Sequence, residues 1–242
     1  MQIDPSLVTS LATAGAASTV GLVAYAVRGR SAEIFAPSIY RGSPNKPQVA
    51  LTFDDGPSES TPALLEVLSE QNVKATFFMC GRNVRRFPDI AREVVAAGHE
   101  IGNHTESHAY LHFHSPEYIY HELAMAQQSI RTVTGYKPRW FRAPYGVRWL
   151  GLRRAQRRLG LTGVMWTTIT RDWKWSSCRV ARLMLHVAKN GSIFCLHDGR
   201  ETAASPDIRS TIDAVEAAIP RLKDRGFQFV TLTEMFSEHP KT

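Results

Sequence analysis

Strand patterns alternate with helix patterns along most of the chain after Gln48, and this alternation limits the folds that the chain can adopt. The expected strands, short and rich in Val, Ile, Phe, Thr and Trp, are residues 49–53, 75–80, 100–103, 140–142, 163–169, 192–196 and 229–231. Strands separated by helices pair in parallel, so we predict an α/β protein. About seven parallel strands favour a distorted (β/α) barrel, with an open, doubly wound sheet as the alternative.

The helices between these strands carry recognisable end signals. Thr61 and Ser115 are each followed by proline, which is typical of an N-cap and a first helical residue. Gly98 and Gly135 are typical of helix C-termini. The helix after Ser115 repeats apolar residues at helical spacing, so it is expected to bury one face.

The N-terminal region departs from this alternation. Residues 8–27 form an uncharged run close to the length that spans a bilayer, followed by Arg28 and Arg30. We therefore expect residues 1–30 to be an apolar segment and candidate membrane anchor, 31–47 a linker and 48–242 the main domain. The expected location is at a membrane, on a side that the sequence leaves open. A packed helix in a cytoplasmic protein and a cleaved signal are the alternatives.

Charge and cysteine content narrow the range of partners. The formal net charge is +7, which favours anionic partners. The chain has no zinc-finger spacing, RNP-like segment or basic heptad region, so nucleic acid is not an expected partner. Cys80, Cys178 and Cys195 have no CxxC spacing and are expected to be buried thiols. The oligomeric state stays open.

Charged residues gather at the expected strand ends. Residues 51–57 read LTFDDGP, which puts Asp54 and Asp55 at the end of an apolar strand, just before a turn. The same position, at or just after a strand end, is shared by His104, Arg142, Asp172 and His197. In barrels of parallel strands the carboxyl ends form one rim, where functional groups collect. We therefore predict one site built from residues far apart in the sequence.

A metal site is expected at this rim. His104 and His108 stand four residues apart, and in a helical turn this spacing lets two imidazoles share one cation. With the Asp55 carboxylate they form a set that leaves coordination positions open for water and substrate. Non-haem iron oxygenases use the same ligand types, so the set does not fix the reaction. Asp54, beside the cation, is a candidate proton acceptor.

Further residues complete the predicted site. His197 could protonate a leaving group, with Asp172 holding its ring and raising its pKa. Arg142 could orient Asp54 through a charge-assisted hydrogen bond; a surface ion pair is the simpler alternative. Aromatic residues that could form walls for a sugar ring, or belong to the core, are Tyr145, Trp173 and Trp175.

Five segments together resemble the motifs of the polysaccharide deacetylase family (the NodB homology domain, carbohydrate esterase family four). They are LTFDDGP, NHTESH, FRAPYG, RDW and CLHD, and they occur in the family order. The resemblance covers residues 47–236 and implies a distorted (β/α) barrel, so 48–242 becomes the expected catalytic domain. The implied reaction is hydrolysis of the N-acetyl group of an amino-sugar glycan of the N-acetylglucosamine type, which releases acetate.

The resemblance also implies roles for single residues. Asp54 is similar to the family's catalytic base and Arg142 to the arginine that orients it. The implied metal ligands are Asp55, His104 and His108, with zinc as the first expectation and cobalt, nickel or manganese as alternatives.

The remaining implied roles concern the acid and the pocket. His197 is similar to the general acid and Asp172 to the carboxylate that tunes it. The implied substrate-binding residues are Pro144, Tyr145 (through its backbone N–H), Trp173 and Cys195. Many family members have leucine in place of Cys195, against the acetyl methyl group, so a different acyl group is an open alternative.

Two other functions stay open. The first is a deacylase or deformylase of a lipid-linked amino sugar at the membrane, which the apolar N-terminus and the arginine-rich residues 153–158 favour. The second is a carbohydrate-binding protein that has lost activity.

Overall fold

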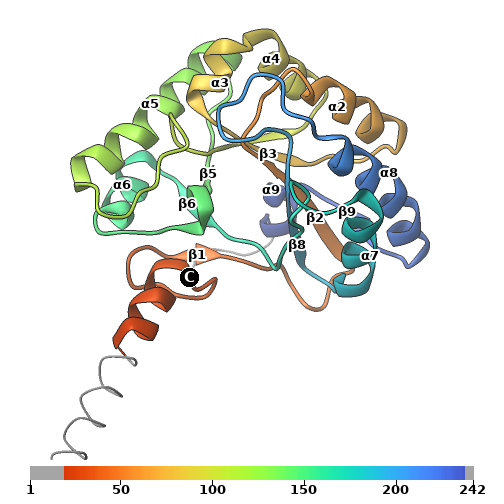
Figure 1. The fold of residues 1–242 in the computed structure, drawn as a ribbon, viewed down its shortest axis with the longest axis horizontal. Coiled ribbons are helices and arrows are strands. Elements are labelled where there is room, and N and C mark those ends of the chain that lie inside the picture. The colour runs from red at the N-terminus through yellow and green to blue at the C-terminus, as the bar shows by residue number, and fades with distance from the viewer. Residues whose placement is uncertain (1–18, 238–242) are drawn as a thin grey trace, which may run out of the picture.

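Parallel strands form one curled sheet with helices around its outer side in the computed structural model, which describes residues 19–237 (Figure 1). The strands are β1 (Ser38–Ile39), β2 (Gln48–Asp54), β3 (Thr76–Met79), β4 (Glu100–Asn103), β5 (Trp140–Phe141), β6 (Thr162–Val164), β7 (Thr168–Ile169), β8 (Ser192–His197) and β9 (Gln228–Phe229). Their order is β1-β6-β5-β4-β3-β2-β8-β7, and β9 pairs with β2. β1 and β7 are the two edges of this sheet, and no described strand joins them, so the barrel is curled but not closed. The curled sheet of parallel strands with helices outside it confirms the predicted distorted (β/α) barrel.

The strand predicted over residues 163–169 is two strands. β6 pairs with β5 and β1, whereas β7 pairs with β8. Residues 165–167 lead from one edge of the sheet to the other: the Met165 N–H donates to the Ile39 carbonyl (2.7 Å) and the Thr167 N–H to the Ile193 carbonyl (3.0 Å). β1 lies inside the segment expected to be a linker, so this part of it contributes to the sheet.

The helices follow the expected alternation. They are α2 (Thr61–Glu70), α3 (Gly81–Arg86), α4 (Pro88–Ala96), α5 (Pro116–Thr134), the 3-10 turn η1 (Pro144–Gly146), α6 (Leu152–Leu159), α7 (Ser177–Val187), α8 (Arg209–Asp224) and α9 (Leu232–Phe236). Ser115 caps α5 as predicted, because its hydroxyl accepts from the Tyr118 N–H (3.2 Å). Gly135 ends α5 in the left-handed conformation, with a φ of 72°.

The predicted N-cap of α2 is wrong by one residue. The N-cap is Ser60, and Thr61 is the first helical residue. The Thr61 hydroxyl instead accepts from the Ser58 N–H (2.9 Å) and donates to Asp198 Oδ2 (2.7 Å). Thr61 thus ties the turn after β2 to the end of β8 rather than capping its own helix.

The sheet buries apolar side chains on both faces. Along β2, Val49, Leu51 and Phe53 belong to the cluster shared with the outer helices. Ala50 belongs to a second cluster with Leu232 and Met235 of α9. Successive strand residues point to opposite faces, so α9 covers the face of β2 that the outer helices do not cover. The polar residues at the carboxyl ends of the strands therefore lie next to well-packed apolar clusters on both faces of the sheet.

The segment before β1 begins in a helix that covers residues 19–28 of the described chain and extends away from the barrel (Figure 1). None of the helices that the structure describes has both the length and the hydropathy needed to cross a bilayer. Most of the uncharged run over residues 8–27 lies outside the described residues, so the anchor stays a prediction.

Candidate functional site

A cleft of about 530 Å³ opens at the carboxyl ends of the strands. The three expected metal ligands line it, as do Asp54, Tyr145, Trp173, Cys195 and His197. Asp54 ends β2 and His197 ends β8, and these two residues are partners in the register of the two strands. The predicted gathering of strand-end residues therefore follows from the sheet itself.

Asp55 meets both imidazoles in the cleft. Its Oδ1 lies 3.3 Å from His104 Nε2 and 3.0 Å from His108 Nε2. All three residues are buried, and their ligand atoms lie within 4.8 Å of one another.

The two histidines do not share a helical turn, contrary to the sequence-based expectation. Residues 104–108 form a loop in which Thr105 and His108 have φ values of 67° and 59°. Buried Glu122 of α5 accepts hydrogen bonds from the N–H groups of Glu106 (3.1 Å) and Ser107 (2.9 Å). These bonds satisfy backbone donors that a helix would use, so the loop brings the imidazoles together with a different geometry.

The donor set fits a divalent transition metal. The Nδ1 atom of His104 lies 2.7 Å from the Arg142 carbonyl, so Nδ1 carries the proton and Nε2 presents its lone pair. Asp55 Oδ1 faces that lone pair and accepts no hydrogen bond from a described residue. A buried acceptor facing a second acceptor is unfavourable unless a cation lies between them.

Arg142 holds Asp54 from inside the barrel. Its guanidinium is fully buried and donates from Nη1 to Asp54 Oδ1 (2.6 Å) and to the Thr52 hydroxyl (2.7 Å). The same group donates to the carbonyls of Val164 (3.4 Å) and Met165 (3.2 Å). The alternative of a surface ion pair is therefore wrong, because this pair is buried and fixed on several sides.

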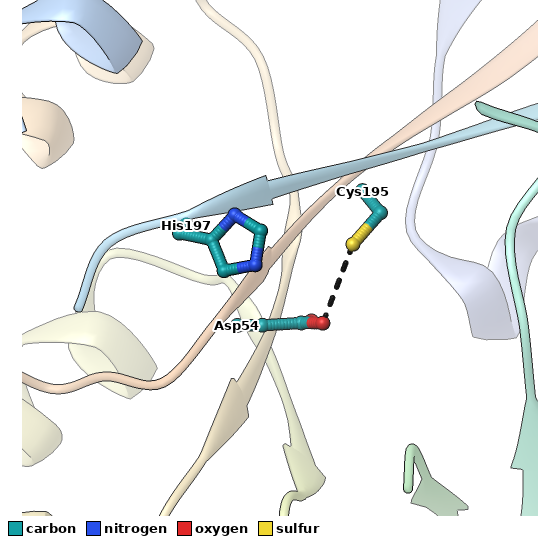
Figure 2. A group of neighbouring side chains, drawn as sticks. All are labelled: Asp54, Cys195 and His197. Carbon is teal, nitrogen blue, oxygen red and sulfur yellow. Dashed lines mark hydrogen bonds between the residues drawn. The ribbon is translucent and has the colours of Figure 1, made fainter. Parts of the chain in front are cut away.

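Cys195 contacts the other oxygen of Asp54. Figure 2 shows its sulfur directed at the Asp54 carboxylate, and the Sγ–Oδ2 distance is 3.4 Å. Burial and the charge of Asp54 raise the pKa of the Cys195 thiol well above its usual range. A protonated thiol is a weak hydrogen-bond donor and a poor metal ligand. Asp54 Oδ2 thus has only a weak partner, and the group of Asp54, Cys195 and His197 suits a cation less well than the group around Asp55.

His197 is held by a buried carboxylate. Asp172 Oδ1 lies 2.8 Å from His197 Nδ1, and Asp172 Oδ2 accepts from the His197 N–H (2.8 Å) and the Thr211 hydroxyl (2.6 Å). Burial favours the neutral ring, but the charge and hydrogen bond of Asp172, helped by Asp55 and Asp54, raise the pKa of His197 to about 9. The ring is therefore protonated at neutral pH.

Aromatic side chains form part of the cleft wall. Trp173 contacts the His197 ring edge-on, with 4.8 Å between ring centres. Tyr145 stacks on Tyr110, with 3.7 Å between their ring centres. The backbone of Tyr145 has a φ of 56°, which is rare for a residue other than glycine. Pro144 and Trp175 do not line the cleft. Pro144 is buried one residue before Tyr145, and Trp175 packs under the Arg179 guanidinium, 3.9 Å from its ring centre.

Three charged cleft residues escaped the sequence-based prediction. Glu201 donates its N–H to Asp55 Oδ2 (2.8 Å) and accepts from the Tyr145 hydroxyl (2.7 Å). Arg200 and Arg28 also line the cleft. Arg200 and Glu201 follow the end of β8, so the strand-end rule could have found them. Nothing in the sequence connects Arg28 with this site.

The fold and the cleft define a class of protein. It is a distorted (β/α) barrel whose strand ends carry a two-histidine, one-carboxylate group, a second carboxylate fixed by a buried arginine, and a histidine fixed by a buried aspartate.

Comparison with known proteins makes the assignment specific. A family model described as polysaccharide deacetylase matches residues 41–164, and the chain belongs to this family. It is 33% identical over 204 residues to the peptidoglycan-N-acetylglucosamine deacetylase PgdA of Listeria monocytogenes, covering 84% of this chain and 41% of that protein. The chain thus spans about two fifths of that relative. It is 37% identical over 194 residues to a chitooligosaccharide deacetylase of Azorhizobium caulinodans, covering 76% of this chain and 91% of the relative.

Solved structures agree with this assignment. A peptidoglycan N-acetylglucosamine deacetylase superposes with a TM-score of 0.77 at 34% identity, covering 85% of this chain and 95% of that one. A family 4 acetyl xylan esterase from Clostridium thermocellum, in complex with a cobalt ion, superposes with a TM-score of 0.71 at 35% identity, covering 78% and 90%.

Proposed function

We propose that the protein hydrolyses the N-acetyl group of an N-acetylglucosamine-type glycan. The amide carbon–nitrogen bond breaks, water supplies the hydroxyl and the proton, and acetate and a free amine form. One observation carries this proposal: the cleft holds both a candidate cation site around Asp55 and a separate carboxylate, Asp54, whose Oδ1 accepts a hydrogen bond from Arg142. The names of the relatives, which act on peptidoglycan or chitooligosaccharides, supply the substrate class.

A divalent transition metal would be held by Asp55, His104 and His108, with zinc preferred over cobalt, nickel or manganese. Bound there, it would polarise the substrate carbonyl and make a water more acidic. Asp54 accepts the proton of the attacking water at Oδ2, because Arg142 occupies Oδ1. The Tyr145 N–H stabilises the negative oxygen that develops on the carbonyl.

His197 completes the reaction as the general acid. Asp172 holds Nδ1, so Nε2 is the atom that donates a proton to the departing amine. Because the amine is a poor leaving group when it is unprotonated, this transfer lets the bond to the acyl carbon break. Trp173 packs against the same ring and limits its movement.

Acetate release from a neutral N-acetylglucosamine tetramer tests the proposal. The zinc-loaded protein should release acetate, and Asp54→Asn should lower kcat by about 100- to 10,000-fold while the protein retains zinc. The matched control is Asp89→Asn, which changes an exposed carboxylate outside the cleft and should behave like the wild type. Full turnover by the zinc-loaded Asp54→Asn protein would show that Asp54 is not the base.

We also propose that residues 1–27 attach the protein to a membrane. The support is the uncharged run over residues 8–27. The full chain should sediment with membranes and resist extraction by salt, whereas a chain that begins at residue 19 should stay in the supernatant. Equal distribution of the two chains would contradict the attachment.

A further inference from the structure

The N-terminal segment over residues 26–36, called the docked segment below, is part of the folded domain. Three of its alanines, Ala26, Ala32 and Ala36, are buried. Arg148 holds its backbone: the guanidinium donates to the carbonyls of Gly29 and Ala32, and the Arg148 N–H donates to the Val27 carbonyl (3.0 Å). The Arg153 guanidinium donates to the Glu33 carbonyl in the same way.

The burial of Arg148 makes this docking strong. Its side chain is only 1% exposed, and no described carboxylate pairs with it. A buried guanidinium without a counter-ion costs free energy unless hydrogen bonds satisfy it. The carbonyls of the docked segment supply bonds to both Nη atoms, while Nε has no partner among the described residues, so detaching the segment would leave the whole guanidinium without hydrogen bonds.

The docked segment brings Arg28 to the cleft. Arg30 donates to the Thr167 carbonyl, in the stretch that connects β6 to β7. Arg28 lines the cleft together with Trp166 and Ile169 from the same part of the chain. The segment expected only to link an anchor to the domain therefore contributes a cation to the site.

The charges in the cleft leave this cation without a partner. Asp54 pairs with Arg142, Asp55 belongs to the cation site, and Glu201 accepts from the Tyr145 hydroxyl. Within residues 19–237 no carboxylate lies within ion-pair distance of Arg28. Among the described residues, Arg200 donates hydrogen bonds to the carbonyls of Gly199 (2.9 Å) and Asp207 (3.4 Å). Arg28 thus lines the cleft without an ion pair among the described residues, whereas Arg200 interacts with the charges of Asp172 and Asp207.

We propose that Arg28 is a substrate-binding residue that selects glycans carrying an anionic group, a carboxylate or a phosphate, near the acylated amino sugar. A guanidinium binds either group through two parallel hydrogen bonds, and Arg200 adds positive potential in the same cleft. This inference rests on the proposed function, because it assigns the substrate class of the same site.

Three glycans and one substitution test the inference in the zinc-loaded full chain. The first glycan is the neutral N-acetylglucosamine tetramer. The second is a tetrasaccharide in which N-acetylmuramic acid alternates with N-acetylglucosamine, so that it carries carboxylates. The third is the neutral tetramer with a phosphate at its reducing end. The wild type should have a higher kcat/KM on at least one anionic glycan, and Arg28→Ala should lower the anionic-to-neutral ratio about tenfold, mainly through KM.

Two further variants separate charge recognition from structure. Arg28→Lys should restore part of the ratio, since it keeps the charge but loses the paired hydrogen bonds. Arg221→Ala removes an exposed arginine of α8 that lies outside the cleft, and the ratio should not change. A ratio that Arg28→Ala leaves at the wild-type value, or that Arg221→Ala lowers equally, would overturn the inference.

Binding measurements keep this inference distinct from the proposed function. If the zinc-loaded wild type releases no acetate from any of the three glycans, the proposed function fails. Calorimetric binding of the same glycans to Asp54→Asn, with and without Arg28→Ala, then decides the role of Arg28. If Arg28→Ala lowers the affinity tenfold for the carboxylate glycan alone, Arg28 binds the carboxylate. If it lowers the affinity for the phosphate glycan alone, Arg28 binds the phosphate. If it lowers neither affinity, the inference is contradicted.

Discussion

Asp172 shows how one buried carboxylate can set both the orientation and the charge of a neighbouring imidazole. One oxygen faces His197 Nδ1, and the other accepts from the His197 N–H and the Thr211 hydroxyl. Burial opposes ionisation of Asp172, but His197 and Thr211 outweigh it and lower the pKa of the Asp172 carboxyl. The acid and the base of the proposed reaction thus have different partners: Asp172 holds and charges His197, whereas Arg142 holds one oxygen of Asp54.

Asp172→Asn should shift the alkaline limb of the pH–rate profile to lower pH. A general acid must be protonated, so activity is present below the pKa of His197 and is lost as the pH rises through that value. In the wild type this pKa is raised to about 9. The substitution removes the charge that raises it, so the ring loses its proton at a lower pH. We expect the limb to move down by at least about one pH unit, which lowers the protonated fraction of His197 at pH 8, and kcat/KM with it, by about twofold or more.

Profiles of kcat/KM against pH for the two proteins measure this shift. Asp213→Asn, a change at an aspartate of α8 outside the cleft around His197, is the matched control and should leave the limb in place. A profile for Asp172→Asn that falls in height without moving along the pH axis would show that Asp172 only positions the ring.

Cys195 should widen the range of acyl groups that the cleft accepts. It is buried, lines the cleft beside Asp54, and is smaller than the leucine found in many family members. Cys195→Leu should therefore reduce kcat/KM for an N-propionyl substrate about tenfold or more relative to N-acetyl, because one methylene in an apolar pocket is worth about 10- to 200-fold. The measurement is the N-propionyl to N-acetyl ratio for the two proteins. An unchanged ratio would place the acyl group elsewhere.

At the scale of elements, the loop over residues 104–108 shows what a sequence pattern can and cannot predict. The spacing of His104 and His108 predicted correctly that the two imidazoles meet, but it predicted a helical turn. The loop conformation depends on Glu122, which lies far along the chain in α5 and whose bonds to the loop backbone no local pattern reveals. Residue types at strand ends thus predict the composition of a site better than its backbone.

The same limit applies to the strands. The run over residues 163–169 has strand propensity throughout. Propensity alone cannot predict that its first part pairs with β5 and its last part with β8. Arg28 is the extreme case, since its approach to the cleft depends on Arg148, which follows η1. The alternation predicted the barrel because it is a property of the whole chain, whereas these details depend on single long-range contacts.

Glu122→Ala should weaken metal binding although Glu122 does not touch the metal site. The Glu106 and Ser107 N–H groups would lose their acceptor, so the loop would no longer hold His104 and His108 in one arrangement. Residues that orient metal ligands contribute about 10- to 100-fold to affinity, and we expect a loss in that range for zinc. Competition with a chromophoric chelator measures it. Glu117→Ala, an exposed glutamate in the first turn of α5, is the matched control and should bind zinc like the wild type.

At the scale of the whole molecule, the site exists only when the barrel is folded. Asp55 follows β2, the two histidines follow β4, and Glu201, which contacts Asp55, follows β8. The pairing of β2 with β3 and β8, and of β3 with β4, brings these segments to one rim. A ligand that needs all of them binds the folded chain and scarcely binds the unfolded one, so its binding free energy adds to the free energy of unfolding.

Removal of the metal should therefore lower the melting temperature. A ligand present at a hundred times its dissociation constant stabilises the folded state by about 2.7 kcal/mol, which for a domain of this size corresponds to a shift of about 5 to 10 °C. Thermal unfolding of the chelator-treated protein, before and after zinc is restored, measures the shift. Asp54→Asn should keep it, because Asp54 lies outside the metal group, whereas Asp55→Ala should lose it. The reverse order would place the cation at Asp54, Cys195 and His197 and would exchange the roles of the two adjacent aspartates.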